Sequence, residues 1–139
     1  MLAVLVRQPP LGPAGPKEPG EGAPENVVEK ASKRGAALLC AACGSRVTSL
    51  DQRIEVDGAH SHAFLNPAGY VYRIGCFATA PGVRIGSPPS DEFSWFSGHV
   101  WEVVLCGACT THLGWRFSRE ASFFFALILA RLREDPATS

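Results

Sequence analysis

Four of the five cysteines stand in two pairs with the spacing Cys-x-x-Cys: Cys40 with Cys43, and Cys106 with Cys109. One tight turn can present two such thiolates to a metal ion, and two turns complete the tetrahedral four-sulfur shell that zinc prefers. With four thiolates bound, no position remains for water or substrate, so we expect one zinc ion in a structural role. The alternatives are redox-active pairs or buried thiols without a metal.

The long segment between the pairs, residues 44–105, is far longer than the roughly 15–20 residues of a compact zinc ribbon. The two turns should therefore hold together the ends of a whole sheet domain. Gly44 follows the first pair and Gly107 lies inside the second, where a side chain would clash in many tight turns.

The charge balance and the apolar runs restrict the partners. The 139 residues carry 13 Lys and Arg against 13 Asp and Glu, which disfavours a nucleic-acid partner. The longest apolar run, Phe123–Ala130, is shorter than the roughly 18 residues of a spanning helix, so we expect no membrane association. Leu2–Val6 is too short for a secretory signal. We expect a cytoplasmic protein, where thiols stay reduced and bind metals.

The chain divides into two regions by composition. Residues 1–35 hold six of the 11 prolines and five of the 14 glycines, which predicts a disordered tail. Residues 36–135 alternate short apolar stretches with turn signals, which is typical of antiparallel β structure. Asn66-Pro67-Ala68-Gly69 fits a type I turn, and Ser87-Pro88-Pro89-Ser90 should interrupt the sheet.

Two strands and one helix are expected in the folded region. Tyr70, Tyr72, Ile74 and Cys76 should share one strand face, and Trp101, Val103 and Leu105 should share another. Phe124, Ile128 and Leu132 recur every four residues, which predicts a terminal helix from about Arg119 to Glu134. We expect this helix to pack on the sheet, although its apolar surface could instead bind a partner.

All three tryptophans, Trp95, Trp101 and Trp115, fall within 21 residues, together with Phe93, Phe96 and Phe117. Tryptophans usually form part of a core, and composition alone leaves core and binding cage equally open. The order of motifs adds a further indication. Asn-Pro-x-Gly, Ser-Trp-Phe-x-Gly-x-x-Trp, Cys-x-x-Cys and His-x-Gly-Trp-x-Phe follow one another within residues 38–132. This order resembles the CULT family, the cereblon-type thalidomide-binding domains.

The resemblance implies a β-tent, in which two antiparallel sheets meet at a steep angle and are pinned by the zinc. It also implies a pocket for cyclic imides such as glutarimide, including the cyclised Asn or Gln ends of broken protein chains. Trp95, Trp101 and Trp115 would form its walls, Phe117 its base, and Asn66 and Pro67 would lie near the ligand's polar edge. The backbone of Phe93, Ser94 and Trp95 would face the imide. Uridine-like compounds are expected as secondary ligands, because uracil presents the same acceptor–donor–acceptor edge.

Two departures from the family pattern change the expectations. Animal members carry a histidine where this chain has Phe93, so a side-chain hydrogen bond is lost and an altered affinity follows. The regions that connect animal members to a ubiquitin ligase have no counterpart in the sequence, so the chain resembles a stand-alone, prokaryote-like member without ligase adaptor regions.

Several residues suggest other functions. Cys76 could serve a redox enzyme of the methionine sulfoxide reductase type, which shares the β-tent architecture, but a buried thiol in an apolar strand is the preferred interpretation. His60 and His62 are interpreted as turn residues, and His112 as a hydrogen-bonding residue without a catalytic partner. We therefore expect no enzymatic activity. A zinc-dependent protein-interaction module that uses the terminal helix is the third alternative.

Overall fold

The computed structural model describes residues 35–66 and 68–136, and within this part the chain is built almost entirely from β-strands. The predicted tail of residues 1–35 lies outside the described residues apart from Gly35. The strands are β1 (Ala37–Cys40), β2 (Arg46–Ser49), β3 (Ser61–Leu65), β4 (Val71–Phe77), β5 (Val83–Ile85), β6 (Val100–Cys106), β7 (His112–Arg119), β8 (Ser122–Ile128) and β9 (Leu132–Glu134). Two short 3-10 turns complete the elements, η2 (Leu50–Gln52) and η3 (Leu129–Arg131).

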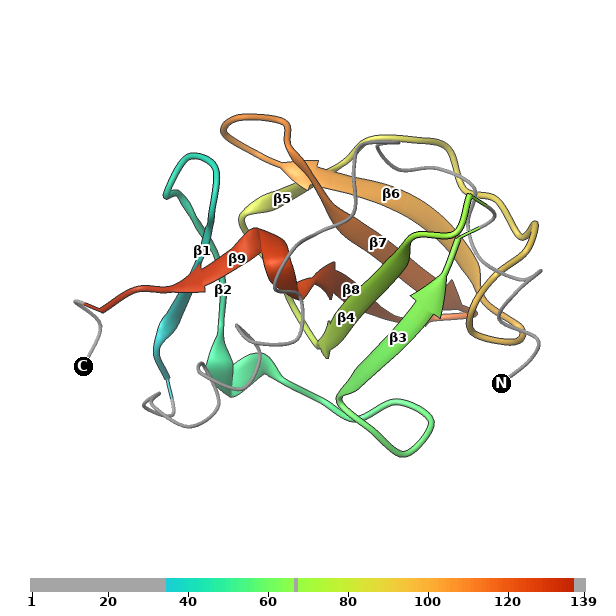
Figure 1. Ribbon diagram of the computed structural model, residues 1–139. Helices are drawn as coiled ribbons and strands as arrows, with labels where there is room; N and C mark the ends of the chain where they lie inside the picture. Colours follow the sequence, from blue (N-terminus) through green and yellow to red (C-terminus); the bar gives the residue numbers. More distant parts are fainter. Residues whose placement is uncertain (1–34, 67, 137–139) are drawn as a thin grey trace.

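The strands form two antiparallel sheets, as the resemblance to the CULT family implied. A small sheet has the order β2-β1-β9, and a large sheet has the order β3-β4-β8-β7-β6-β5. Figure 1 shows the small sheet beside one end of the large one, with η3 leading the chain from β8 across to β9. Strand β8 of the large sheet is therefore joined directly to the small sheet.

Side chains on both faces of the large sheet are buried, in two separate clusters. Val104, Cys106 and Leu127 pack with Leu38 and Val47 of the small sheet. The other cluster is aromatic and contains Phe64, Tyr72, Trp95, Phe96, Trp101, Trp115, Phe117 and Phe124. Strand alternation explains the division, because successive residues of a strand point to opposite faces.

The predicted C-terminal helix is wrong. Residues 119–134 form the end of β7, strand β8, η3 and strand β9. Strand β8 lies between β4 and β7, and all residues from Phe124 to Ile128 are buried because both faces of this strand are covered. A strand covered on both sides is apolar at consecutive positions, so its sequence can imitate a buried helix. Here the turn after Arg119 and the pairing of Phe123–Leu127 with β7 form a hairpin instead.

The other predicted strands are confirmed, and the chain turns after β3 and leaves the sheet after β5 as predicted. Tyr72, Ile74 and Cys76 lie buried on the same face of β4, and Trp101 and Val103 lie on the same face of β6. Tyr70, the remaining residue of the predicted β4 set, precedes the strand. The turn after β3 is closed by a 2.9 Å hydrogen bond from the Gly69 N–H to the Asn66 carbonyl. The segment 86–89 interrupts the sheet between β5 and β6.

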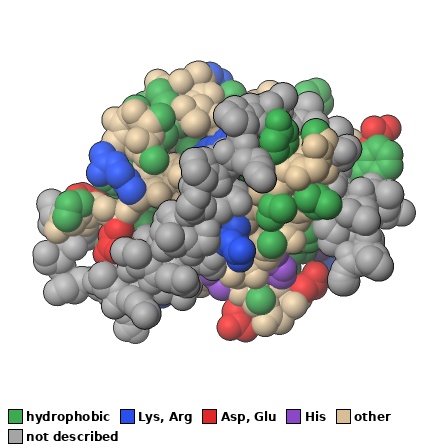
Figure 2. Space-filling view, viewed as in Figure 1, with side chains coloured by type: hydrophobic (Ala, Val, Ile, Leu, Met, Phe, Trp, Pro, Cys, Tyr) green, Lys and Arg blue, Asp and Glu red, His purple; other side chains and the backbone are tan. Residues whose placement is uncertain are grey.

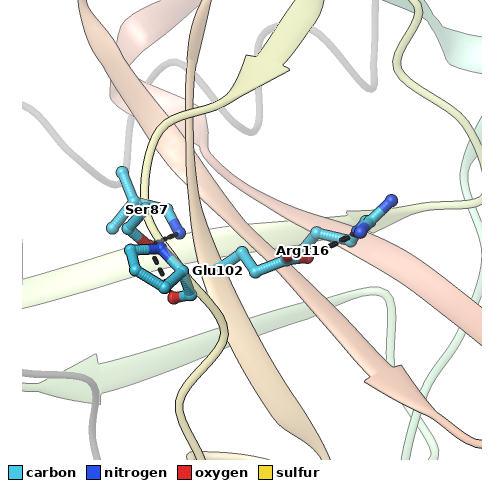
Figure 3. A network of polar contacts seen from close by, with 5 residues as sticks. Ser87, Glu102 and Arg116 are labelled. Carbon is cyan, nitrogen blue, oxygen red and sulfur yellow. Dashed lines mark hydrogen bonds and ion pairs between the residues drawn. The ribbon is translucent and has the colours of Figure 1, made fainter.

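Polar contacts secure this interruption against the sheet (Figure 3). The Ser87 hydroxyl accepts a 2.9 Å hydrogen bond from the Val103 N–H and donates to the Pro88 carbonyl. On the neighbouring strands, the Arg116 guanidinium reaches Glu102 Oε1 at 2.7 and 2.9 Å. Such a partly exposed ion pair contributes about 1 kcal/mol, so it aligns β6 with β7 more than it stabilises them.

Charges of both signs are scattered between apolar and polar side chains on the face seen in Figure 2. Among the described residues, none forms a helix long and apolar enough to span a bilayer.

Candidate metal and aromatic site

The two Cys-x-x-Cys turns have the same backbone geometry. In the first turn, the Cys40 N–H donates to the Ser45 carbonyl, and the Cys40 carbonyl accepts from the Gly44 N–H. In the second turn, the Cys106 N–H donates to the Thr111 carbonyl, and the Cys106 carbonyl accepts from the Thr110 N–H. The fourth residue after each leading cysteine has a left-handed backbone, with φ of 82° at Gly44 and 67° at Thr110. Such a bend favours glycine, which supports the predicted role of Gly44.

The four sulfur atoms come together as a compact group. Cys40 Sγ lies 3.8 Å from Cys109 Sγ, Cys43 Sγ lies 3.7 Å from Cys106 Sγ, and all four lie within 4.8 Å of one another. Sulfurs bound at about 2.3 Å in a regular tetrahedron are about 3.8 Å apart, so the spacing fits a four-thiolate metal shell. The four cysteines are reduced and can hold one metal ion.

The surroundings already favour the thiolate form at part of this group. Burial opposes ionisation of Cys106, but hydrogen bonds from Ser45, from the amides of Cys109 and Ala108 and from Cys43 lower its pKa to about 6. The Thr111 hydroxyl and amide lower the pKa of Cys109. Burial instead raises the pKa of Cys40 to about 11. A bound cation is the charge that would allow all four sulfurs to ionise together.

The group of four cysteines, called the metal group below, lies beside a close contact between the two sheets, and Gly82 makes this contact possible. Its N–H donates to the Val47 carbonyl of β2 at 3.0 Å, and its carbonyl accepts from the Gly107 N–H at 2.8 Å. A Cβ at position 82 would lie 2.0 Å from the Arg46 carbonyl oxygen, and one at position 107 would lie 2.9 Å from the Gly82 carbonyl oxygen. Glycine is therefore required on both sides of this contact.

The structure brings the predicted cage residues together on the other face of the large sheet. Trp101 and Phe117 lie opposite each other on β6 and β7, and Trp115 pairs with Val103 on the same strands. Trp95 comes from the loop before β6, and its ring centroid lies 4.7 Å from that of Trp115 and 6.4 Å from that of Phe117. All four rings are buried, with 8% exposure for Trp95 and 2% or less for the others.

The three indole N–H groups differ in their partners. That of Trp101 donates to the Glu92 carbonyl at 2.9 Å and so ties the loop to β6. Among the described residues, those of Trp95 and Trp115 have no hydrogen-bond acceptor although both are buried. A buried donor without a partner costs about 1–3 kcal/mol, so native proteins rarely leave two of them close together.

A β-bulge turns β7 from the metal group toward the aromatic cluster. Val104 pairs with Gly114 and Leu105 with His112, so Leu113 is the extra residue and packs on the metal side. A Cβ at Gly114 would meet the Ala126 carbonyl oxygen at 2.1 Å. Bulges commonly re-aim a side chain beside a functional site, and here the next residue, Trp115, enters the aromatic cluster.

His112 fixes the bulge. Its Nε2 lies 3.0 Å from the Gly114 carbonyl, its ring meets Trp115 edge to face at 4.8 Å, and its own carbonyl accepts from Arg131 Nη1 at 2.9 Å. Burial, followed by the charge of Arg131, lowers the pKa of His112 to about 4, so its ring is neutral near pH 7 and Nε2 carries the donated proton. The structural interpretation of His112 from the sequence is consistent with these contacts.

The remaining predicted ligand-binding residues lie around this cluster. Phe93 is 47% exposed and has a left-handed φ of 52°, which is uncommon for an aromatic residue. The Ser94 hydroxyl donates to the Phe96 carbonyl within the same loop. Asn66 Oδ1 accepts the Tyr70 N–H at 2.8 Å and thus shapes the turn. Pro67 lies outside the described residues.

The other residues considered from the sequence are held inside the fold. Cys76 has no exposed surface, and burial, with a smaller contribution from Asp57, raises the pKa of its thiol to about 12. A thiol that stays protonated is a poor nucleophile. His60 lies within hydrogen-bond distance of the Ile54 carbonyl, and His62 within that of the Val56 carbonyl, so both histidines fasten the connection before β3.

Comparison with known proteins finds cereblon proteins of several animals. The chain is 36% identical over 56 residues to "Protein cereblon" of Gallus gallus, which covers 40% of this chain and 13% of that protein. It is 38% identical over 56 residues to the Danio rerio protein and 26% identical over 98 residues to that of Drosophila virilis, covering 40% and 66% of this chain. No family model matches the chain.

The similarity to these proteins supports a cereblon-type domain in the chain. Two antiparallel sheets, a four-cysteine metal-binding group and an aromatic cluster accompany the sequence similarity. The aligned segments span 13% and 15% of the relatives' length, so the similarity concerns one domain of those proteins.

Sequence reasoning missed several residues of the candidate site. Phe64 and Tyr72 contribute rings to the aromatic cluster, at 4.5 and 6.3 Å from the Trp95 ring. Ser45 and Thr111 contact the cysteine sulfurs at 3.0–3.4 Å. Ser45 and Thr111 each follow the second cysteine of a pair by two residues. This shared spacing of a hydroxyl residue is a signal that could have identified them.

Proposed function

We propose that this domain binds small cyclic imides in the aromatic cluster, and that its four cysteines hold one structural zinc ion. The ligand class includes glutarimide, thalidomide-like compounds and the cyclised Asn or Gln ends of protein chains, with uridine-like compounds as weaker ligands. The domain acts as a binding module without catalytic residues. No ligase adaptor function is proposed for the chain.

The single observation that supports imide binding is the pair of buried indole N–H groups of Trp95 and Trp115, which have no acceptor among the described residues. Both tryptophans belong to the buried aromatic cluster, so a ligand that fits here must be flat and largely apolar and must present carbonyl oxygens. A cyclic imide has two carbonyls beside one N–H on a small ring. Its N–H can meet a backbone carbonyl of the loop that contains Phe93 and Ser94.

The metal assignment is supported by the donor set. Four thiolates with tetrahedral spacing suit zinc, and a closed four-ligand shell suits a structural role. When bound, zinc would fix the ends of β1 and β6, while the residues of β6 and β7 carry two of the three tryptophans. Elemental analysis of the purified protein should give about one zinc per chain.

The decisive test of imide binding is titration with glutarimide, followed by tryptophan fluorescence and calorimetry. The matched variant is Trp115→Phe, which keeps an aromatic ring and removes one orphaned N–H. Its glutarimide affinity should fall about 5- to 30-fold, because a hydrogen bond is worth about 1–2 kcal/mol, while its stability should not fall by a similar amount. N-methylglutarimide, which lacks the imide N–H, should bind much more weakly than glutarimide.

The result against the proposal would be an absence of glutarimide binding at millimolar concentration in the zinc-loaded protein. Equal affinity of the wild type and Trp115→Phe would show instead that the indole N–H is not a ligand contact. The redox alternative loses support because Cys76 is buried and protonated. The interaction-module alternative relied on a terminal helix, which is replaced by β8 and β9.

A further inference from the structure

We infer that Phe64 occupies the place of a planar ligand against Trp95, and that this side chain sets both the affinity and the size of the ligands admitted. The inference rests on the proposed imide-binding function and adds to it a residue that controls access to the same site.

The ring contacts of Trp95 single out Phe64. The two rings are stacked, with centroids 4.5 Å apart and an interplanar angle of 13°. The other contacts of the Trp95 indole are edge-on or tilted, at 75° to Trp115, 48° to Tyr72 and 34° to Phe117. Among the described residues, Phe64 is therefore the ring that stacks on a flat face of the Trp95 indole, and it is 8% exposed in this position.

The phenyl ring of Phe64 stacks on the Trp95 indole but offers no hydrogen-bond acceptor to the nearby indole N–H groups. Phe64 has no acceptor, so the buried N–H groups of Trp95 and Trp115 remain without a partner among the described residues while it covers Trp95. A flat ring that carries carbonyl oxygens could stack in the same way and also accept from an indole N–H. A ligand of this kind in place of Phe64 would therefore supply the hydrogen-bond acceptor that the two indole N–H groups lack among the described residues.

The location of Phe64 in the sheet makes its displacement feasible. Strand β3 is at the edge of the large sheet and pairs with β4 alone. Phe64 lies opposite Tyr72, and only the Leu65–Val71 pair separates it from the turn at Asn66. Moving the end of this hairpin disturbs few ladder hydrogen bonds, whereas Trp101 and Trp115 lie on strands that are paired on both sides. Edge segments of this kind open at low free-energy cost.

Three consequences follow for Phe64→Ala. Removing the competing ring should tighten glutarimide binding about 2- to 13-fold, the factor that corresponds to one aromatic pair contact. Larger imides should gain more than glutarimide, because the space left by the ring becomes part of the site. In the absence of ligand, Trp95 should become accessible, so acrylamide should quench tryptophan fluorescence more strongly than in the wild type.

The experiment compares zinc-loaded wild type, Phe64→Ala, Phe64→Leu and Phe123→Ala. The leucine variant keeps apolar bulk without a flat ring and protects the test if the alanine variant folds poorly. Phe123 is 50% exposed on β8, so its variant should match the wild type in both measurements. Acrylamide quenching without ligand and calorimetric titration with glutarimide are measured for all four proteins.

Tighter glutarimide binding and stronger quenching in the Phe64 variants, with Phe123→Ala unchanged, would support the inference. If the wild type binds glutarimide and the affinity of Phe64→Ala and Phe64→Leu is equal to or lower than that of the wild type, the inference is overturned. The proposed function then stays intact, because Phe64 would either contact the ligand or have no effect on its binding. If neither the wild type nor the variants bind glutarimide, the proposed function fails, and this inference fails with it. Unchanged quenching would show that Phe64 does not cover Trp95 and would also overturn the inference.

Discussion

The contact at Gly82 gives the most direct test of how the two sheets and the metal group depend on each other. The Gly82→Ala substitution places a Cβ 2.0 Å from the Arg46 carbonyl oxygen and 2.7 Å from Val47 Cα. Both atoms belong to the backbone of β2, so no side-chain rotation can relieve the clash. A carbon and an oxygen need a separation of about 3.2 Å, so the two segments must move apart by about 1 Å.

The expected cost follows from the hydrogen bonds that this movement disturbs. Gly82 donates to the Val47 carbonyl at 3.0 Å and accepts from Gly107 at 2.8 Å. Weakening two such bonds, at about 1–3 kcal/mol each when a buried partner is left unsatisfied, predicts a loss of about 2–6 kcal/mol. The total stability of a domain is about 5–15 kcal/mol, so this is a large fraction. Because Gly107 lies between Cys106 and Cys109, metal affinity should fall as well.

The assay is equilibrium urea unfolding of the zinc-loaded protein, together with chelator competition for the metal. Gly58→Ala is the matched control, since Gly58 has a left-handed φ of 87° and a Cβ added there would meet no atom within 4 Å. It should cost only about 1–2 kcal/mol, from backbone strain, and leave metal affinity unchanged. A Gly82→Ala protein within about 1 kcal/mol of Gly58→Ala, with wild-type metal affinity, would refute the reasoning.

Two further predictions concern the metal and the neutral histidine. Cys106→Ser removes one of four ligands, and since structural zinc contributes about 10–16 kcal/mol in small domains, cooperative unfolding should be lost, whereas Cys76→Ala should still bind metal. A Cys106→Ser protein with the wild-type unfolding midpoint would contradict this. The pKa of His112 is about 4 in the fold and about 6.5 in an unfolded chain, so the unfolded state binds more protons between these values. Wild-type stability should therefore fall by about 3 kcal/mol as pH drops from about 6.5 to about 4, and the difference between wild type and His112→Gln, from urea unfolding at several pH values, should follow that fall. If the difference in unfolding free energy between the wild type and His112→Gln does not change with pH, the conclusion that His112 is buried and neutral is contradicted.

Local patterns were sufficient for the features that depend on neighbouring residues. The Cys-x-x-Cys spacing predicted the metal-binding group, and the alternation in β4 and β6 predicted which side chains share a face. The turn after β3 followed from Asn66 and Gly69. In each case the deciding interactions lie within a few residues, so the sequence contains the information directly.

The terminal segment shows where local patterns failed. Its apolar spacing matched a helix because the periodicity of a strand disappears when both faces are covered. The small sheet covers one face of β8, and the loop that contains Trp95 and Phe96 covers the other. Both contacts join segments that are distant in the sequence. Helix and strand therefore could not be distinguished from residues 119–134 alone.

The sequence by itself determined the four cysteines of the metal group, the β-rich class and the set of tryptophans, because these depend on residue type and short spacing. Tertiary structure decided how these features are joined: the metal group lies at the contact of two sheets through Gly82, and the bulge at Leu113 turns Trp115 toward Trp95. It also decided that Phe64 covers Trp95 and that two indole N–H groups lack acceptors among the described residues. The physical reason is that stacking and hydrogen-bond satisfaction depend on distances between strands that are far apart in the chain, and only the packed sheets set those distances.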